Sequence, residues 1–274
     1  ETKLIGNYLI GLRKDFHKYP ELSMQEHRTS RKIKEELDKI NVKYKEGIRT
    51  EVVATIGHGE GKVIALRADM DALRIKENTG VRYQSENEGV MHACGHDAHM
   101  ASLLGAAMIL KKYENDIPGK IVLIFQPGEE CSSGARLISE HGYIDEVEEI
   151  FGLHVFGDIE CGKISIEEGP RMAASNKFTI KITGKSGHAG KPQQCIDATI
   201  VCAAIVMNLQ SIISREIDPL NSAVVTIGHI KSGETHNIIS GEAFIEGTIR
   251  CFNASTTKHI QTSIKRIAYS TAIA

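Results

Sequence analysis

The chain has 274 residues, of which 41% are hydrophobic, so it is long enough for a substantial core in one large domain or two ordinary ones. Its 33 Lys and Arg residues nearly balance its 35 Asp and Glu residues, which gives a formal net charge of -2. This balance argues against the one-signed field that nucleic acid or an anionic membrane requires, so we expect a small-molecule partner.

The amino-terminal segment ETKLIGNYLIGLRKDFHK mixes charges among apolar residues and does not resemble a signal peptide. No run of residues approaches the length of an apolar spanning helix. We therefore predict a soluble cytoplasmic protein. The six cysteines are too few and too scattered for a disulfide framework, so a special cysteine is expected to be a metal ligand or a nucleophile.

The first part of the chain alternates helical and strand-like patterns. We predict helices at 4–19, 26–40, 97–113 and 133–142, and strands at 52–57, 62–73, 120–126 and 149–156. The first two strands are joined by the glycine-rich turn GHGEG in a tight connection. The alternation predicts an α/β layer, in which sites gather at the carboxyl ends of the strands.

A second pattern begins near residue 177. It predicts a strand at 177–184, a helix at about 196–214, strands at 222–230 and 242–252, and a helix from about 255. This order is most of a split βαββαβ unit without its last strand. The final residues continue an apolar helical pattern without a cap, so we expect the chain to end inside an element and the sequence to be incomplete.

The segment HACGHDAH (92–99) holds three His, one Cys and one Asp in eight residues. Thiolate and neutral imidazole suit zinc, and nearby carboxylates suit manganese. Cys94 and His96 are two apart in a predicted loop, so both can converge on one ion. Asp97 and His99 are better placed as supporting partners or helix-start residues. The alternative for this segment alone is a surface His beside a buried Cys.

The segment QPGEE (126–130) places two carboxylates side by side, directly after a predicted buried strand and a Pro-Gly turn. Adjacent side chains at a strand end point in different directions, so the two acids can take different roles. One can bind metal while the other takes a proton from a metal-bound water and passes it to the leaving nitrogen of an amide. Taken alone, such a pair most often marks a solvated loop.

The segment RADMDAL places Asp69 and Asp71 on one face of a strand. Acids there are costly unless they are paired or lie near a cation. Two interpretations remain open: one acid pairs with Arg67 or Arg74, or both acids orient metal-binding histidines.

A further histidine, His154, lies in the apolar sequence FGLHVF near the end of a predicted strand. Alone it would be interpreted as a core histidine. Polar residues nevertheless lie at the ends of three predicted strands. Because such residues are expected to gather at one edge of the sheet, His154 is a candidate ligand.

Successive segments resemble, in order, the signatures of the metallopeptidase family that includes aminoacylase and carboxypeptidase. They are LRKDFHKYPELSMQE, ALRADMDAL, MHACGHDAHM, IFQPGEE, GLHV, GKSGHAG and GETHNIISGEAFIEGTIR. The resemblance is to the amidohydrolase branch, which includes hippurate hydrolase, auxin-conjugate hydrolases and N-acetyldiaminopimelate deacetylase. It runs from about residue 12 to about residue 252 and is more specific than any single motif.

The resemblance implies a mixed-sheet α/β catalytic domain with helices on both faces, here residues 1–175. It also implies an α+β, ferredoxin-like lid and dimerisation domain, here residues 176–274. Two divalent metal ions are implied, zinc or manganese, with nickel and cobalt as further candidates. The implied ligands are Cys94, which would bridge the ions, His96, Glu130 and His154. Glu129 would be the general base, and Asp69, Asp71 and Asp97 would support the ligands.

In the second domain, the resemblance implies that His188 reaches a partner subunit's active site in a homodimer and stabilises the tetrahedral oxyanion. Asn237 and Arg250 match positions that hold the substrate's carboxylate. The implied substrate is an N-acyl amino acid or a small peptide, and no residue distinguishes acetyl from benzoyl or indole-acetyl groups.

The sequence departs from the family pattern at two points. Gly128 stands where the family usually has Ala, which leaves the chemistry unchanged. The family also has a final His ligand, supplied after the chain leaves the lid, that this sequence does not contain. We therefore do not expect full activity from the chain in isolation.

A phosphate loop at GKSGHAGKP fails because Lys185 and Pro192 replace required residues. A non-catalytic protein with a structural zinc site would leave the paired Glu residues unused. A cysteine hydrolase could use Cys94 as nucleophile with His96 or His99 as base. We predict a metal-dependent amidohydrolase or peptidase, with the last two as alternatives.

Overall fold

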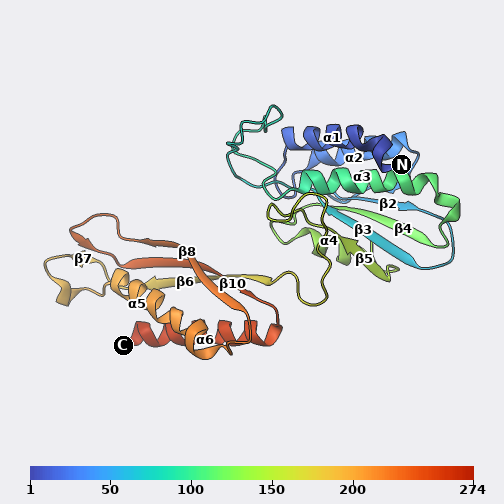
Figure 1. Ribbon diagram of the computed structural model, residues 1–274. Coiled ribbons are helices and arrows are strands. Elements are labelled where there is room, and N and C mark those ends of the chain that lie inside the picture. Colours follow the sequence, from blue (N-terminus) through green and yellow to red (C-terminus); the bar gives the residue numbers. More distant parts are fainter. The chain divides into compact units, whose positions relative to one another are not determined.

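In the computed structural model, which describes residues 1–274, the chain forms two units, Glu1–Ile164 and Ser165–Ala274 (Figure 1). Each unit has its own sheet and its own buried apolar core. Helices and strands occur in both, and the sheet of the first unit contains parallel and antiparallel pairs. The predicted mixed α/β fold is confirmed.

The first unit contains a five-stranded sheet in the order β1-β2-β4-β3-β5. The strands are β1 (Tyr44–Lys45), β2 (Val52–Ile56), β3 (Val63–Asp69), β4 (Lys120–Gln126) and β5 (Glu149–Gly152). β3 is parallel to β4 and β5, whereas β2 is antiparallel to β4 and to β1. β4 reads KIVLIFQ, as expected for a strand that is covered on both faces.

Helices cover both faces of this sheet (Figure 1). They are α1 (Thr2–Lys18), α2 (His27–Lys39), α3 (His96–Lys112) and α4 (Gly134–Glu140), with a 3-10 turn at Glu114–Asp116. The first three helices build the main core with Phe16, Leu37 and Leu104 against Leu123 and Phe125. α4 packs Leu137 and Ile138 in a smaller core on the other face. The first unit is therefore a three-layer structure.

The tight connection expected at GHGEG joins β2 to β3, but these two strands do not pair with each other. β4 lies between them, antiparallel to β2 and parallel to β3. The connecting loop bonds instead to the turn before β4. Gly59 N–H donates to the Gly119 carbonyl (3.2 Å), and Gly61 N–H donates to the Pro118 carbonyl (3.0 Å). These hydrogen bonds hold the two loops close together.

The second unit has a three-stranded antiparallel sheet in the order β6-β10-β8. Its main elements are β6 (Ala174–Thr183), α5 (Ala198–Ser211), β8 (Ala223–Ser232), β10 (Glu242–Cys251) and α6 (Ala254–Ile273). Shorter elements are β7 (Gly187–His188), β9 (Ile238–Ile239), a 3-10 turn at Pro192–Gln194 and a π turn at Ile212–Glu216. The strand order is that of the first three strands of a split βαββαβ unit.

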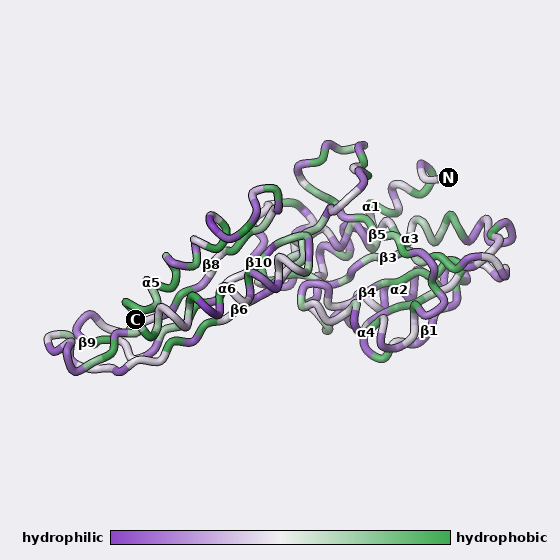
Figure 2. Tube along the Cα trace, turned by 90° about the horizontal axis from the view of Figure 1, so that it is seen from below, coloured by the Kyte–Doolittle hydropathy of each residue, from purple (hydrophilic) through white to green (hydrophobic).

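One face of this second sheet is covered by α5 and α6. Along β6, Phe178, Ile180 and Ile182 belong to the core or pack against it, while the intervening Lys177 and Lys181 are exposed. Hydropathy accordingly alternates along the strands in Figure 2. This period of two is the pattern of a strand with one buried face.

The segment Ala198–Glu216 is long and apolar enough to cross a membrane, judged by length and composition only. Its inward residues Ala198, Cys202, Ile205 and Leu209 belong to the core of the second unit. A core helix passes the same test, so this finding is weak evidence for a membrane span.

Candidate metal centre

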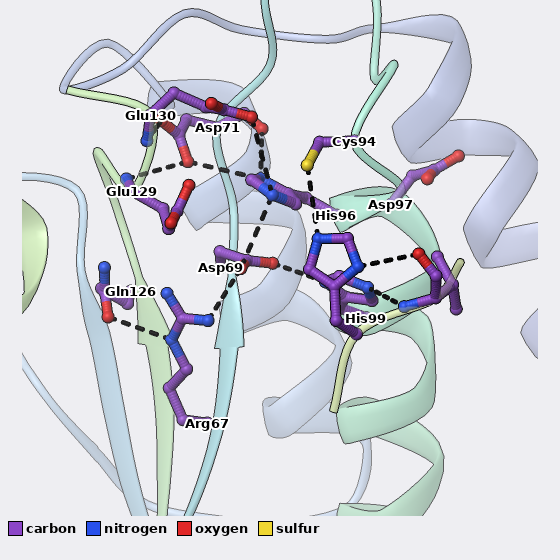
Figure 3. Close-up of polar contacts among 12 residues, drawn as sticks. Arg67, Asp69, Asp71, Cys94, His96, Asp97, His99, Gln126, Glu129 and Glu130 are labelled. Atoms are coloured by element: carbon purple, nitrogen blue, oxygen red, sulfur yellow. Dashed lines mark hydrogen bonds and ion pairs between the residues drawn. The ribbon is translucent and has the colours of Figure 1, made fainter. Parts of the chain in front are cut away.

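Four chain segments meet at one edge of the first sheet. β3 ends at Asp69, β4 runs into the PGEE turn, β5 ends shortly before His154, and α3 begins at His96. Because β3, β4 and β5 are parallel, their carboxyl ends lie at the same edge. The polar residues that follow these strands therefore gather around the start of α3 (Figure 3).

His96 lies at the centre of this cluster. Ligand-type atoms of Cys94, His96 and His154 lie within 4.8 Å of one another, and so do those of His96, Glu129 and Glu130. The four ligands predicted from sequence and the predicted base are thus brought together around one imidazole. Thiol, imidazole and carboxylate donors that converge in this way are suited to bind divalent cations.

The two ligand-type histidines present the same ring nitrogen to the cluster. His96 Nδ1 donates to the Asp71 carbonyl (2.8 Å), and its Nε2 is buried and has no hydrogen-bond partner. His154 Nδ1 donates to the Val155 carbonyl (2.7 Å), and its Nε2 lies 3.3 Å from Cys94 Sγ. A backbone carbonyl that fixes the tautomer in this way is typical of metal-binding histidines. The orphaned Nε2 of His96 therefore fits a cation.

Asp71 holds the PGEE turn in place. Its carboxylate accepts hydrogen bonds from the backbone N–H groups of Glu129 (3.1 Å) and Glu130 (3.0 Å), and from the Ser23 hydroxyl (2.6 Å). Burial raises the pKa of Asp71, but these hydrogen bonds and the one with His96 outweigh burial and lower it. A buried anion therefore positions the two adjacent glutamates, whose side chains are left to point into the cluster.

Gly128 has a conformation that explains its presence in this turn. Its φ is +56°, in the left-handed region, and a side chain would meet Cys131 Sγ and Met24 Sδ at 3.1 Å. Its N–H donates to the buried carboxylate of Glu26 (2.9 Å). Glycine adopts this backbone conformation without the strain that other residues would incur.

Asp69 makes both kinds of contact that the sequence left open, a pair with an arginine and a hydrogen bond with a histidine. It pairs with Arg67 (2.7 Å) and also accepts a hydrogen bond from His99 Nδ1 (2.7 Å), with His96 Nε2 at 3.5 Å. Burial raises the pKa of Asp69, but the His99 hydrogen bond and the nearby positive charges lower it to about 2. Asp69 therefore stays ionised beside the cluster and supplies negative charge behind the histidines.

His99 uses both of its ring nitrogens. Nδ1 donates to Asp69, and Nε2 accepts a hydrogen bond from the Val155 N–H (3.0 Å). The ring is 2% exposed and lies 4.8 Å from that of His154, centroid to centroid. His99 therefore links β3 to the segment that carries His154. Sequence reasoning gave it only a general supporting role, because nothing local indicated its distant partners.

The Cys94 thiol is protonated at neutral pH when no cation is present. Burial, together with the nearby carboxylates of Glu130, Glu129 and Asp69, raises its pKa to about 12. A thiol in this environment is a poor nucleophile. A bound cation reverses the effect, because a coordinating thiol loses its proton.

Asp97 points away from the cluster, toward α1. It accepts hydrogen bonds from Arg13 Nε (2.8 Å) and His17 Nδ1 (2.7 Å), and the other nitrogen of His17 lies 3.1 Å from Glu77. The hydrogen bond to Asp97, together with that to Glu77, raises the pKa of His17. Asp97 therefore ties the start of α3 to α1 and does not contact the ligands. His17 and Glu77 were not singled out from the sequence.

His92 is the remaining histidine of the motif. It is 4% exposed, and neither ring nitrogen has a hydrogen-bond partner. Burial lowers its pKa to about 4, so the ring is neutral.

The second unit carries the other three predicted site residues. His188 and Asn237 lie close together at the β7–β9 pair, where His188 faces Ile238 and the Ala189 N–H donates to the Asn237 carbonyl (3.1 Å). Arg250 lies near the far end of β10, opposite Ser175 and Val224, and contacts Thr248. At about 3.3 Å per residue along a strand, Arg250 is too distant to share one small ligand with Asn237 of the same unit.

The sequence of this chain is similar to those of known proteins. The sequence model of peptidase family M20/M25/M40 matches residues 65–268. An IAA-amino acid hydrolase of Arabidopsis thaliana is 42% identical over 95% of this chain and 60% of its own length. An N-acetyl-L-cysteine deacetylase of Bacillus subtilis is 43% identical over 92% of this chain and 61% of its own length. The chain thus spans about 60% of the length of these relatives.

Solved structures agree with this assignment. A Bacillus subtilis protein described as a dinuclear metal-binding peptidase of the M20 family superposes with a TM-score of 0.82 at 37% identity. The match covers 99% of this chain and 71% of that one. A structure from methicillin-resistant Staphylococcus aureus superposes with a TM-score of 0.90 at 35% identity, over 98% of this chain and 72% of that one.

Proposed function

The chain belongs to peptidase family M20/M25/M40, and from this premise we propose that it is a metal-dependent hydrolase that cleaves the amide bond of N-acyl amino acids or small peptides. The observation that carries the proposal is the meeting of donor groups at His96, among them one with Cys94 and His154 and another with Glu129 and Glu130. The names of the relatives support the same class of amide substrate.

In this proposal two divalent cations are held by Cys94, His96, Glu130 and His154. The buried, unpartnered Nε2 of His96 supports the assignment, as does the mixed set of thiol, imidazole and carboxylate donors. Thiol and imidazole favour zinc and carboxylates suit manganese, with nickel and cobalt as further candidates. When bound, such cations supply positive charge that acidifies water and polarises the amide carbonyl.

Glu129 is proposed to move the proton. Its carboxylate is exposed and accepts no hydrogen bond from the protein, while its backbone N–H is fixed by Asp71. A free carboxylate in a fixed position can accept the proton of the attacking water and deliver it to the leaving nitrogen. Glu130 is adjacent and is 22% exposed, which supports the division into one ligand and one base.

The second unit is proposed to act as a lid and to form a homodimer. Under this proposal His188 reaches the active site of a partner subunit and stabilises the oxyanion, while Asn237 and Arg250 bind substrate carboxylate groups. Exposed Ile200 and Met207 on α5 support a subunit contact, because large apolar side chains favour burial. A mixture of a His188 variant and a Glu129 variant should regain activity if His188 acts across the dimer.

A cysteine hydrolase is the second candidate, because Cys94 Sγ lies 3.3 Å from His154 Nε2. The raised pKa of the thiol argues against it, since the reactive species is the thiolate. A chelator separates the two: it should abolish hydrolysis by a metal enzyme and leave a thiol enzyme active. A structural zinc site, the third possibility, would give no hydrolysis at all.

The decisive experiment is Glu129→Gln in the full-length protein. We expect turnover of an N-acyl amino acid to fall by about 10²- to 10⁴-fold, while bound metal, measured by elemental analysis, stays at the wild-type level. Glu60→Gln, at an exposed position in the GHGEG loop, is the control and should match the wild type. Wild-type turnover in Glu129→Gln, or loss of its metal, would overturn the assigned role.

A further inference from the structure

A cavity of about 380 Å³ opens on the first unit beside the metal cluster. Its lining comes from α1, from the loop 79–83, from Met91–Gly95 and from Val155–Gly157. The volume lies in the range of small-molecule sites. The function proposed above assigns no role to this cavity.

The cavity lies on the side of the cluster away from the paired glutamates. Cys94 forms part of its wall, whereas Glu129 and Glu130 do not. In Figure 3, Glu129 and Glu130 lie to one side of His96, and Cys94 and Asp97 lie to the other. The arginine and histidine that contact Asp97 from α1 also line the cavity, which agrees with this placement.

The direction of proton transfer orients the substrate across the cluster. Glu129 must lie next to the leaving nitrogen, because it delivers a proton there. The amino-acid part of the substrate therefore extends on the Glu129 side. The acyl substituent leaves the carbonyl carbon in the opposite direction, toward Cys94. We propose, building on the function proposed above, that this cavity is the acyl subsite and that it selects bulky aromatic acyl groups over acetyl.

The size of the cavity supports this choice. The methyl of an acetyl group is close in size to a water molecule, whose share of liquid volume is about 30 Å³, so it would leave most of the cavity filled with solvent. A ring-bearing acyl group fills far more of the volume. It also removes more apolar surface from water.

The lining has the chemistry of an aromatic site. Val155 and Phe156 are each 44% exposed, so one wall presents apolar side chains to a ligand. Also in the lining, the Arg13 guanidinium lies 5.2 Å from the centre of the Tyr83 ring and donates to its hydroxyl (3.0 Å). Asp97 also holds Arg13, so this flat surface is formed before a ligand arrives. Aromatic rings and guanidinium planes favour stacking with a flat acyl group.

The test compares substrates that differ only in the acyl group. In the metal-loaded full-length enzyme, kcat/KM is measured for N-acetyl, N-benzoyl and N-(indole-3-acetyl) derivatives of one amino acid. We expect the two aromatic substrates to exceed the acetyl substrate by at least tenfold. Val81→Trp, which fills the cavity, should lower the aromatic-to-acetyl ratio at least tenfold. Leu4→Trp, at an exposed position near the start of α1, is the matched control and should leave the ratio unchanged.

A binding measurement tests the cavity without turnover. These 274 residues contain no tryptophan, so Phe156→Trp adds a fluorescent reporter to the wall, and the unsubstituted protein is the control. Its emission should change on titration with benzoate or indole-3-acetate and not with acetate at equal concentration.

The outcomes separate the two proposals. Hydrolysis of all three substrates with a ratio that Val81→Trp does not alter, or an equal response of the reporter to acetate, would overturn the acyl subsite and leave the proposed function intact. No hydrolysis of any N-acyl amino acid would overturn the proposed function and the subsite with it.

Discussion

The two units differ in what they bury. The first unit buries a set of carboxylates and imidazoles, namely His17, Glu26, Glu36, Glu51, Asp69, Asp71, His92, His96, Asp97 and His99. The second unit buries only apolar residues apart from Thr256 and Ser263. Burial of ionisable groups is costly unless they are paired, so a fold retains them where they hold a site in place.

The difference assigns separate roles to the two units. In the first, paired acids and histidines connect α1, β3, β4 and α3 around the cluster, so stability and site geometry depend on the same hydrogen bonds. In the second, the core is an ordinary apolar layer, and His188 and Asn237 lie on its surface. Matched substitutions in the two units test this division.

The largest effect is expected from Asp71→Ala. It leaves two backbone N–H groups and the Ser23 hydroxyl without their buried acceptor, so the free energy of unfolding of the first unit should fall by about 3–5 kcal/mol. Arg266→Ala breaks an exposed pair with Glu216 in the second unit and should cost at most about 1 kcal/mol. Urea unfolding of the metal-free protein measures both. Equal losses would contradict the division between the units.

His99→Leu should weaken metal binding by about 10- to 100-fold, because it removes the link between Asp69 and the segment that carries His154. His99→Gln can donate and accept hydrogen bonds, and we expect it to recover part of the loss. His259→Leu, at a half-exposed position on α6, is the control. Titration with cobalt, followed by its absorption spectrum, reports the affinity. Wild-type affinity in His99→Leu would show that the link is dispensable.

Asp69 should make the free energy of unfolding of the first unit depend on pH in the acidic range. Its pKa is lowered to about 2 in the folded protein, so its contribution of about 2 kcal/mol is complete above the unfolded value near 4 and is lost as the pH falls through 2. Unfolding of the metal-free protein between pH 5 and 2 measures this slope. Asp69→Asn should flatten it, and Asp218→Asn, at an exposed turn in the second unit, should not. An unchanged slope in Asp69→Asn would assign the acid sensitivity to other groups.

The smallest effect is expected from paired glycine substitutions. Gly128→Ala places a side chain at a positive φ against Cys131 and Met24 and should cost about 1 kcal/mol or more. Gly228→Ala in β8 has open space around it and should leave stability unchanged or slightly higher. Thermal or urea unfolding compares the two. Similar results at both positions would mean that the PGEE turn tolerates a side chain.

Much of the local structure could be predicted from the sequence. β4 lies where the apolar run predicts it, and α3 and α4 lie within a residue or two of the predicted ranges, because their patterns depend on neighbours a few positions apart. The short pairs β1–β2 and β7–β9 were missed, since two-residue strands carry no periodic signal. The tight connection at GHGEG joins β2 to β3 as predicted, but the sequence could not show that β4, more than fifty residues later, lies between these two strands.

The candidate site, too, could be predicted only in part from the sequence. The residue types and their order in HACGHDAH and PGEE were enough to name Cys94, His96, Glu129 and Glu130, and the ordered motifs were enough to name the family. These inferences need only short spacings and the chemistry of each side chain.

Only the tertiary structure decided which groups support the site. Asp97 turned toward α1, while His99 joined Asp69, 30 positions away, and Glu26 received the Gly128 N–H from 102 positions away. The tautomers of His96 and His154, and the cavity beside Cys94, also depend on such contacts. A buried polar group must find its partner wherever the folded chain places one, and that partner leaves no trace in the neighbouring sequence.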